Sequence, residues 1–329
     1  MKALRINQPN QSEIIHLPDP TPGAGEVVIR VRASGICGTD IHIYRGEYLG
    51  EYPVIPGHEF SGEVVEVGKN VSRFRPGDRV AVEPNICCDN CYNCLNNRQN
   101  FCLNWQAIGV TRPGGMADFV VAPEKAVFHI EDMSYEEGAF IEPLSCVLHG
   151  MQRLSIAPAD KVLVLGAGPI GNLLLQVGRL SGAAEITVVD RVLTRIEFAA
   201  TTGADRCLTS LEDLPLDYFD VVIDATGAVA VMARTLDFVR NGGKILLFGV
   251  PPTGSHLTIE PFKIFRKGLT ILSSFTSLRN SYQAVDLLNS GKIQVAALVS
   301  HRLPLDGFQK GITLIEQGIE NVKKVIINP

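Results

Sequence analysis

A glycine-rich turn stands between an apolar strand and an apolar helix in the middle of the chain. The strand is residues 162–165, the helix is residues 172–180, and the turn is Gly166, Ala167, Gly168, Pro169, Ile170 and Gly171. Further apolar strands at 186–189, 221–223, 245–248 and 269–272 alternate with amphipathic segments. Such alternation is typical of parallel strands joined by crossover helices. It predicts an α/β fold with a doubly wound parallel sheet in residues 143–280.

The same turn predicts a dinucleotide site of the Rossmann type. Its glycines let the backbone approach a pyrophosphate, and the N-terminus of the helix offers amides to the phosphates. Asp190 ends the second strand about 20 positions after Gly171, where an acidic side chain hydrogen-bonds the ribose hydroxyls and repels a 2′-phosphate. We therefore expect NAD rather than NADP. Arg191 and, less directly, Arg195 could attract the 2′-phosphate of NADP, so NADP is the alternative cofactor. Arg195 also has an ordinary interpretation as a charged residue on a helix surface.

A polar, Asn-rich loop carries four cysteines separated by two, two and seven residues. This is the spacing of a closed tetrathiolate zinc site, which stabilises a lobe and leaves no position for chemistry. The four are Cys88, Cys91, Cys94 and Cys102, in a lobe of about residues 84–104. Unconnected buried thiols are the alternative, but those are expected on apolar strands. Cys87 could replace Cys88 as the first ligand.

A second metal site can be assembled from residues outside this lobe. Cys37, His58, Glu59 and Glu142 offer one thiolate, one imidazole and a carboxylate. Such a set leaves one coordination position open, as a catalytic zinc requires. Taken singly, each residue has an ordinary interpretation: a small core cysteine, a turn histidine and a surface carboxylate. Only their combination with the tetrathiolate and the glycine turn favours a functional site.

The remaining segments predict a β-rich domain of residues 1–142. Short alternating runs such as 26–33 and 61–67 are broken by Gly, Pro and Asp, which indicates an irregular, partly barrel-like arrangement. Residues 324–327 form an apolar strand that could return to this half. We therefore expect residues 281–329 to complete the catalytic domain.

Composition and charge argue against several other classes of protein. The 329 residues are 46% hydrophobic with a net charge of −5, which suits a soluble protein of two domains. A zinc ribbon that binds nucleic acid needs clustered Lys and Arg side chains, but the only basic residue in positions 87–102 is Arg98. We expect no nucleic-acid or membrane partner and a cytoplasmic, reducing location. A non-catalytic dinucleotide sensor would be favoured if Cys37 or His58 were lacking, and both are present.

Taken together, these motifs resemble the zinc-containing medium-chain alcohol dehydrogenase family, in the branch of polyol, sugar and threonine dehydrogenases. The resemblance extends over the whole chain and includes Gly57-His58-Glu59-Phe60-Ser61-Gly62 and Pro76-Gly77-Asp78-Arg79-Val80. It implies a GroES-like β-barrel catalytic domain, one catalytic and one structural Zn²⁺ per subunit, and a homodimer or homotetramer assembled near residues 269–275. It also implies a catalytic zinc on Cys37 and His58, with Glu59 or Glu142 as the carboxylate.

The resemblance further implies a reaction. Zinc polarises a secondary hydroxyl of a polyol or sugar alcohol, and NAD accepts a hydride to leave a ketone. Thr39 and His42 follow Cys37 by two and five positions, offsets that look like the family's proton relay. A plain surface histidine is the alternative for His42, and Asp40 is interpreted as orienting His58. Threonine, a sugar acid or a polyol phosphate remain alternative substrates.

Few residues can be assigned to the substrate. Tyr44, Glu47 and Tyr48 could face a polar chain, although an exposed loop would hold the same residues. Some polyol dehydrogenases carry a substrate-binding arginine beside the last strand of the cofactor domain. Ser277 stands there in this chain, with Arg279 nearby.

Overall fold

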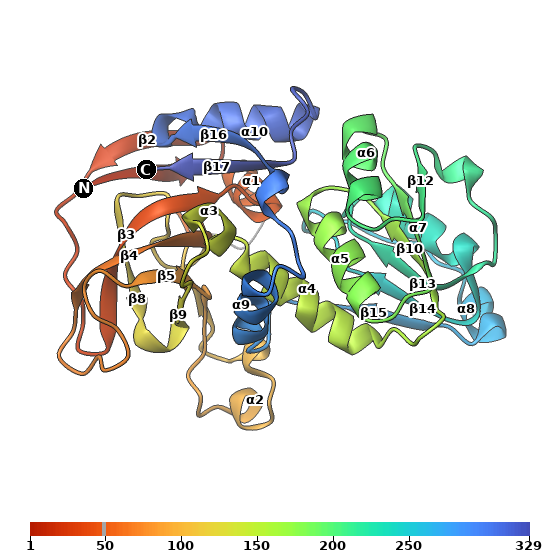
Figure 1. The fold of residues 1–329 in the computed structure, drawn as a ribbon, viewed down its shortest axis with the longest axis horizontal. Coiled ribbons are helices and arrows are strands. Elements are labelled where there is room, and N and C mark those ends of the chain that lie inside the picture. Colours follow the sequence, from red (N-terminus) through yellow and green to blue (C-terminus); the bar gives the residue numbers. More distant parts are fainter. Residues whose placement is uncertain (48–50) are drawn as a thin grey trace. The chain divides into compact units, whose positions relative to one another are not determined.

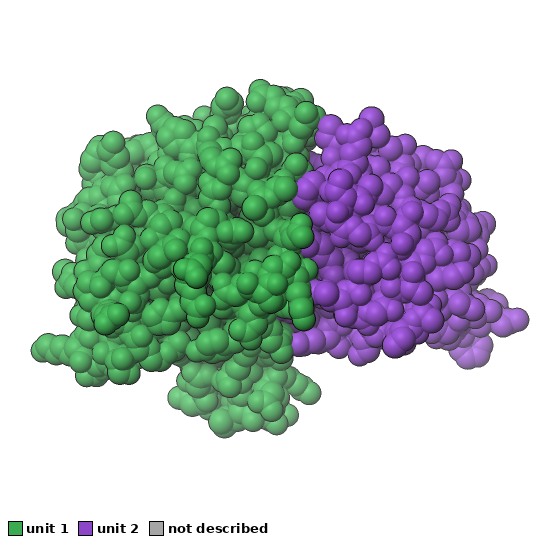
Figure 2. Space-filling model, in the orientation of Figure 1, with its two compact units in different colours: residues 1–145, 276–329 green, residues 146–275 purple. Residues whose placement is uncertain are grey.

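The structure is a computed structural model that describes residues 1–47 and 51–329, so Tyr48 lies outside the described residues. The chain forms two compact units (Figure 2). Unit 1 contains Met1–Ser145 and Thr276–Pro329, and unit 2 contains Cys146–Phe275. Unit 2 is therefore continuous in sequence, whereas unit 1 is made of two separate stretches of chain.

Unit 2 is built on a six-stranded parallel sheet with the order β12-β11-β10-β13-β14-β15 (Figure 1). Its strands are β10 (Lys161–Leu165), β11 (Glu185–Val189), β12 (Arg206–Leu208), β13 (Phe219–Asp224), β14 (Val239–Leu247) and β15 (Thr270–Ser273). The inner strands are almost continuously apolar and buried, as expected for a sheet covered on both faces. The direction in which successive strands are added to the sheet reverses between β10 and β13. Open α/β sheets bind their ligands at such a point, beside the carboxyl ends of the strands.

Four helices lie entirely within unit 2. They are α5 (Pro169–Leu180), α6 (Leu193–Thr201), α7 (Val229–Phe238) and α8 (Pro261–Lys267). Because parallel strands are joined by right-handed crossovers, α5 and α6 cover one face of the sheet and the helix after β13 covers the other. The glycine turn joins β10 to α5, with Gly168 at the N-cap and Pro169 at the first helical position. The turn therefore places the amide groups of α5 at the carboxyl ends of the central strands.

Unit 1 is built on a seven-stranded sheet with the order β16-β17-β3-β4-β5-β9, and β8 pairs with β3. Its strands are β3 (Glu26–Gly35), β4 (Glu59–Val67), β5 (Arg79–Val82), β8 (Phe119–Pro123), β9 (Val127–His129), β16 (Val299–Pro304) and β17 (Lys324–Asn328). The pairing of β17 with β3 is antiparallel and joins residues almost 300 positions apart. The chain thus returns to its first half after unit 2 is complete.

Smaller elements complete unit 1. Two hairpin-like pairs are β1 (Lys2–Gln8) with β2 (Gln11–His16), and β6 (Asn85–Ile86) with β7 (Gln106–Ala107). The helices are α1 (Gly38–Arg45), α2 (Tyr92–Leu95), α3 (Tyr135–Gly138), α9 (Ser281–Asn289) and α10 (Phe308–Gln317), and α4 (Ile141–Leu154) contains the boundary with unit 2. One core cluster packs α10 against β17 and α1, and includes Ile36, Ile43, Phe308 and Val325. Among the described residues, no helix combines the length and apolar character needed to span a bilayer.

The α/β fold with a parallel sheet and a GroES-like domain is confirmed. The expected strands match β10, β11, β13, β14 and β15 within a few residues, except that β14 begins six residues earlier than its apolar run. The strand β12 was not expected from the sequence. It is only three residues long and lies at the edge of the sheet, so it has no apolar run to reveal it.

The close packing of the glycine turn leads to a prediction about stability. A Cβ atom on Gly171 would lie 1.8 Å from the carbonyl oxygen of Gly166, whereas a Cβ atom on Gly168 would meet no atom within 4 Å. We expect Gly171→Ala to lower the free energy of unfolding by about 1–3 kcal/mol or more, because backbone must move. Gly168→Ala is the matched control and should change it by less than about 0.5 kcal/mol. Urea unfolding followed by circular dichroism measures both, and equal losses would contradict the packing argument.

Candidate metal and dinucleotide sites

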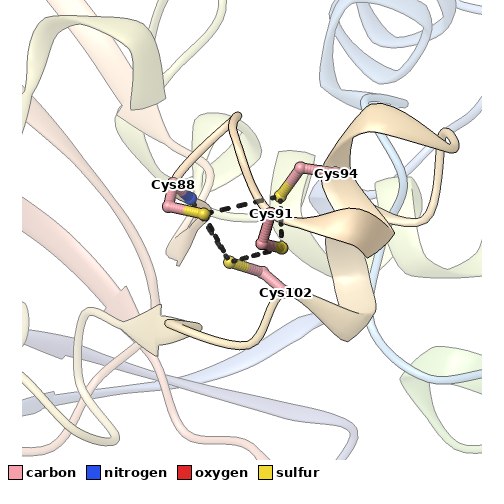
Figure 3. A group of neighbouring side chains, drawn as sticks. All are labelled: Cys88, Cys91, Cys94 and Cys102. Carbon is pink, nitrogen blue, oxygen red and sulfur yellow. Dashed lines mark hydrogen bonds between the residues drawn. The ribbon is translucent and has the colours of Figure 1, made fainter.

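Four sulfur atoms gather in the lobe between β6 and β7. Cys88, Cys91, Cys94 and Cys102 point toward one another, as Figure 3 shows. The sulfur–sulfur distances are 3.5 Å for Cys91 to Cys94 and for Cys102 to Cys88, and 4.0 Å for Cys88 to Cys94 and for Cys91 to Cys102. Thiolates at about 2.3 Å from a tetrahedral zinc lie about 3.8 Å apart. The sulfur atoms are therefore already spaced to hold one zinc ion.

The backbone of the lobe prepares two of these thiols for metal binding. The backbone amide of Asn90 is the main cause that lowers the pKa of Cys88 to about 6, and the amides of Leu103 and Cys94 lower the pKa of Cys91. Burial raises the pKa of Cys94 to about 12, with neighbouring thiols adding to the rise. A metal must therefore displace a proton from Cys94.

Cys87 lies outside this group of sulfur atoms. Its thiol donates to a carboxylate oxygen of Asp89 at 3.1 Å, and burial raises the pKa of Cys87. Asp89 also pairs with Lys125 at 2.6 Å and with Arg279 at 3.2 Å. Arg279 thus contacts the lobe, and Cys88 stands in the position of first thiolate.

A second cluster forms where two loops of unit 1 meet. Cys37 follows β3 and is the N-cap of α1, while His58 and Glu59 stand at the start of β4. One possible ligand atom from each of the three lies within 4.8 Å of the others. The set of one sulfur, one nitrogen and one oxygen fits a zinc ion with an open position.

Asp40 is the buried carboxylate that holds the two loops together. It is fully buried on α1. One oxygen accepts from the backbone amide of Cys37 at 2.8 Å, and the other accepts from the amide of Gly57 at 3.1 Å. The second oxygen also lies 3.4 Å from Nδ1 of His58. Asp40 therefore faces Nδ1 of the imidazole, which leaves Nε2 as the atom available to a metal.

Glu59 has a partner that sequence reasoning did not find. Its Oε2 accepts a hydrogen bond from Nζ of Lys324, the first residue of β17, and the two side chains are 2% and 5% exposed. Burial acts to lower the pKa of Lys324, but the charges of Glu59 and Cys37 outweigh it and raise the pKa. The only sequence signal was a lysine at the start of an otherwise apolar strand.

The other expected catalytic residues are not part of this cluster. Glu142 is buried in the first turn of α4, and its carboxylate is not one of the three clustered ligand groups. Thr39 and His42 lie on α1, one and a half turns or less from Cys37. Nδ1 of His42 is 2.9 Å from the carboxylate of Glu47. Ser277 donates to the buried carboxylate of Glu83 at 2.6 Å, so its hydroxyl is engaged within unit 1.

In unit 2 the residues expected to bind the dinucleotide surround the glycine turn. Asp190 follows β11 and accepts from the amide of Ala167 at 2.8 Å and from the amide of Val192 at 2.9 Å. Arg195 lies 3.8 Å from the same carboxylate, whereas Arg191 is exposed. The turn itself is closed by Gly166, whose φ of 99° suits glycine and whose amide donates to Val189. Gly168, Pro169, Ile170 and Gly171 then begin α5.

The charges around Cys37 and His58 predict a pH dependence of metal binding. Burial and Glu59 raise the pKa of Cys37; burial acts to lower the pKa of His58, but Asp40 and Cys37 raise it well above its usual value. Both groups therefore hold protons near neutral pH, and a metal must displace them. We expect zinc affinity at this site to rise with pH between 6 and 8, by up to about 100-fold per unit. Chelator competition measures it, with Cys37→Ala to isolate the lobe, and a pH-independent affinity would contradict the expectation.

Two family models match the chain. The alcohol dehydrogenase GroES-like domain matches residues 23–132, and the zinc-binding dehydrogenase domain matches residues 169–290. The chain is 38% identical to D-altritol 5-dehydrogenase of Agrobacterium fabrum, over 93% of each chain. It is 33% identical to L-threonine 3-dehydrogenase of Shewanella loihica, over 97% of each chain.

Solved structures of dehydrogenases also match the fold of this chain. A zinc-binding dehydrogenase from Sinorhizobium meliloti bound to NADP superposes with a TM-score of 0.94 at 34% identity, over 100% of this chain and 99% of that one. An alcohol dehydrogenase from E. coli CFT073 complexed with NADH gives 0.92 at 31% identity, with the same coverage. The two-unit fold, the clustered metal-binding side chains and these full-length relatives lead to one conclusion. The chain belongs to the zinc-dependent medium-chain alcohol dehydrogenase family, in its polyol and threonine dehydrogenase branch.

Proposed function

We propose that the protein oxidises a secondary hydroxyl group of a polyol or sugar alcohol to a ketone, with zinc in unit 1 and NAD in unit 2. The observation that carries the proposal is the convergence of Cys37, His58 and Glu59 from two loops into one group with three kinds of ligand atom. The similarity to an altritol dehydrogenase supports a polyol as the substrate. We also propose a cytoplasmic location, in keeping with five cysteines gathered at Cys87–Cys102 as thiols.

Each residue of the cluster has a definite part in this proposal. When bound, zinc acts as a Lewis acid that favours loss of the substrate hydroxyl proton. Cys37 and His58 would hold the metal, and the carboxylate of Asp40 faces Nδ1 of the imidazole ring at 3.4 Å. Lys324 engages one oxygen of Glu59, so Glu59 would offer its other oxygen. Glu142 remains the alternative carboxylate, and Lys324 pairs with Glu59 inside unit 1.

The proton must leave a buried site, and α1 supplies a route. Thr39 offers a hydroxyl on the same helix as His42, whose side chain is 20% exposed and so reaches solvent. In the proposed sequence the hydroxyl of Thr39 passes the proton toward the imidazole of His42, which releases it to water. The four cysteines Cys88, Cys91, Cys94 and Cys102 would hold the structural zinc and take no part in this transfer.

NAD is proposed as the hydride acceptor because Asp190 presents a carboxylate beside the glycine turn. Its oxygens already accept from two backbone amides, which fixes the carboxylate in place. A 2′-phosphate there would meet a negative charge. Arg195 lies close enough to weaken this repulsion, and Arg191 is free to swing toward a phosphate. We therefore propose a preference for NAD that is not absolute.

We further propose a homodimer or homotetramer. The strand β15 ends the sheet order of unit 2, so its outer edge can pair with a second copy. Phe262 and Phe265 on the preceding helix α8 are 65% and 78% exposed and would be covered by such an assembly. The function proposed above does not depend on the number of subunits.

The substrate is tested by the initial rate of NADH formation over a panel of tetritols, pentitols, hexitols, their phosphates, sugar acids, threonine and simple alcohols. We expect a preference for one free polyol. Turnover confined to threonine, sugar acids or phosphates would replace the substrate class, and no turnover on any compound would favour a dinucleotide sensor.

The role of Cys37 is tested by Cys37→Ser. This variant should lower turnover at least about 1000-fold yet leave NAD binding within about twofold, because the dinucleotide belongs to unit 2.

Cofactor choice is tested by Asp190→Ala. Loss of the carboxylate should weaken NAD binding and lower the ratio of kcat/KM for NAD over NADP by at least about tenfold. Because Asp190 also holds the amide of Ala167, Asp190→Asn is the companion variant that retains an acceptor. Fluorescence titration with both dinucleotides separates the two effects. An unchanged preference in both variants would show that Asp190 does not face the ribose.

A further inference from the structure

The carboxylate of Glu47 lies against the imidazole of His42 at the end of α1. The distance from Oε2 of Glu47 to Nδ1 of His42 is 2.9 Å, which is a hydrogen bond. The two side chains are 33% and 20% exposed, so the pair is partly shielded and still reaches water. From the sequence, Glu47 was only a candidate contact for the substrate, and the proposed reaction uses His42 without it.

Local backbone structure holds Glu47 in this position. Helix α1 ends at Gly46, which has a left-handed conformation with φ of 78°. The backbone amide of Glu47 then donates to the carbonyl oxygen of His42 at 2.8 Å. This hydrogen bond is typical of a helix C-cap and folds the chain back over the last turn. The side chains of Glu47 and His42 are thus brought together by a backbone contact between the same two residues.

A carboxylate constrains which nitrogen of a neutral imidazole carries the proton. An ionised carboxylate can only accept hydrogen bonds, so Nδ1 of His42 must be the donor. The proton on Nδ1 leaves Nε2 with its lone pair. In this tautomer Nε2 is the ring atom that can accept a proton, whereas the opposite tautomer would present a hydrogen there and block the transfer.

We propose that Glu47 is a positioning residue that keeps His42 in the Nδ1–H tautomer, so that Nε2 accepts the proton released by the oxidation. This inference rests on the proposed function. The substrate O–H bond breaks, an N–H bond forms at Nε2, and the hydride leaves separately to NAD, so one proton and one hydride are removed per turnover. Glu47 does not take the proton. The protonated imidazole then releases this proton to water.

The tautomer is tested directly by ¹⁵N NMR of protein labelled at histidine, with the His42 signals identified by their loss in His42→Gln. In the unmodified protein, at a pH where His42 is neutral, Nδ1 should give the shift of a protonated nitrogen and Nε2 that of an unprotonated one. Glu47→Gln can still accept through its amide oxygen and should retain this pattern. Glu47→Ala should lose it, and an unchanged pattern in Glu47→Ala would overturn the proposal. Since NMR needs no turnover, the result stands whether or not a substrate is found.

Kinetics supply the second measurement. In dilute buffer Glu47→Ala should lower kcat by about tenfold with little change in KM, because proton transfer is impaired while binding is not. Small imidazole or amine buffers should restore part of the rate, and Glu47→Gln should retain more of it than Glu47→Ala. Glu51→Ala is the matched control, since Glu51 is an exposed acid in the same segment. Equal losses in Glu47→Ala and Glu51→Ala, or a change confined to KM, would contradict a role in proton transfer.

Discussion

The cluster of Cys37, His58 and Glu59 depends on one buried carboxylate, that of Asp40. Its two oxygens hold the amides of Cys37 and Gly57, which belong to segments separated in sequence by a whole helix and a loop. Gly57 is required there, because its φ is 95° and a Cβ would lie 2.7 Å from the amide of Met116. The same carboxylate faces His58. One side chain therefore links the segment that carries Cys37 to the segment that carries His58, and its carboxylate lies beside the imidazole.

The ion pair of Lys324 with Glu59 gives the cluster its charge balance. Two buried charges are stable together but not apart, and removal of one partner typically costs about 3–5 kcal/mol. The cluster places a thiol, an imidazole and two carboxylates within a small volume, and Lys324 is the cation that reaches them from β17. The cluster and the fold therefore depend on the same strand. β17 pairs with β3 in the sheet of unit 1, and it also carries Lys324, the ammonium group that pairs with Glu59.

Local sequence spacing explains why some of the site could be predicted. The four cysteines of the lobe lie within fifteen residues, and the turn from Gly166 to Gly171 is continuous, so each pattern is visible in a short window. Lys324 was missed because its partner Glu59 is 265 positions away and only the pairing of β17 with β3 brings them together. The hydrogen bond of Ser277 to Glu83 depends in the same way on a distant partner. The short edge strand β12 was not predicted because it lacks an apolar run. The contact of Glu47 with His42 was not predicted either, because it depends on the backbone geometry of the helix cap at Gly46.

The insertion of unit 2 into unit 1 has a consequence for the order of events during synthesis. Residues 146–275 emerge as one uninterrupted stretch and can fold while the sheet of unit 1 still lacks β16 and β17. Until the last strand is added, Glu59 has no ammonium beside it, and the edge of β3 that β17 covers is open. A ribosome-bound chain can thus hold a folded unit 2 and a folded cysteine lobe before Lys324 completes the cluster of Cys37, His58 and Glu59.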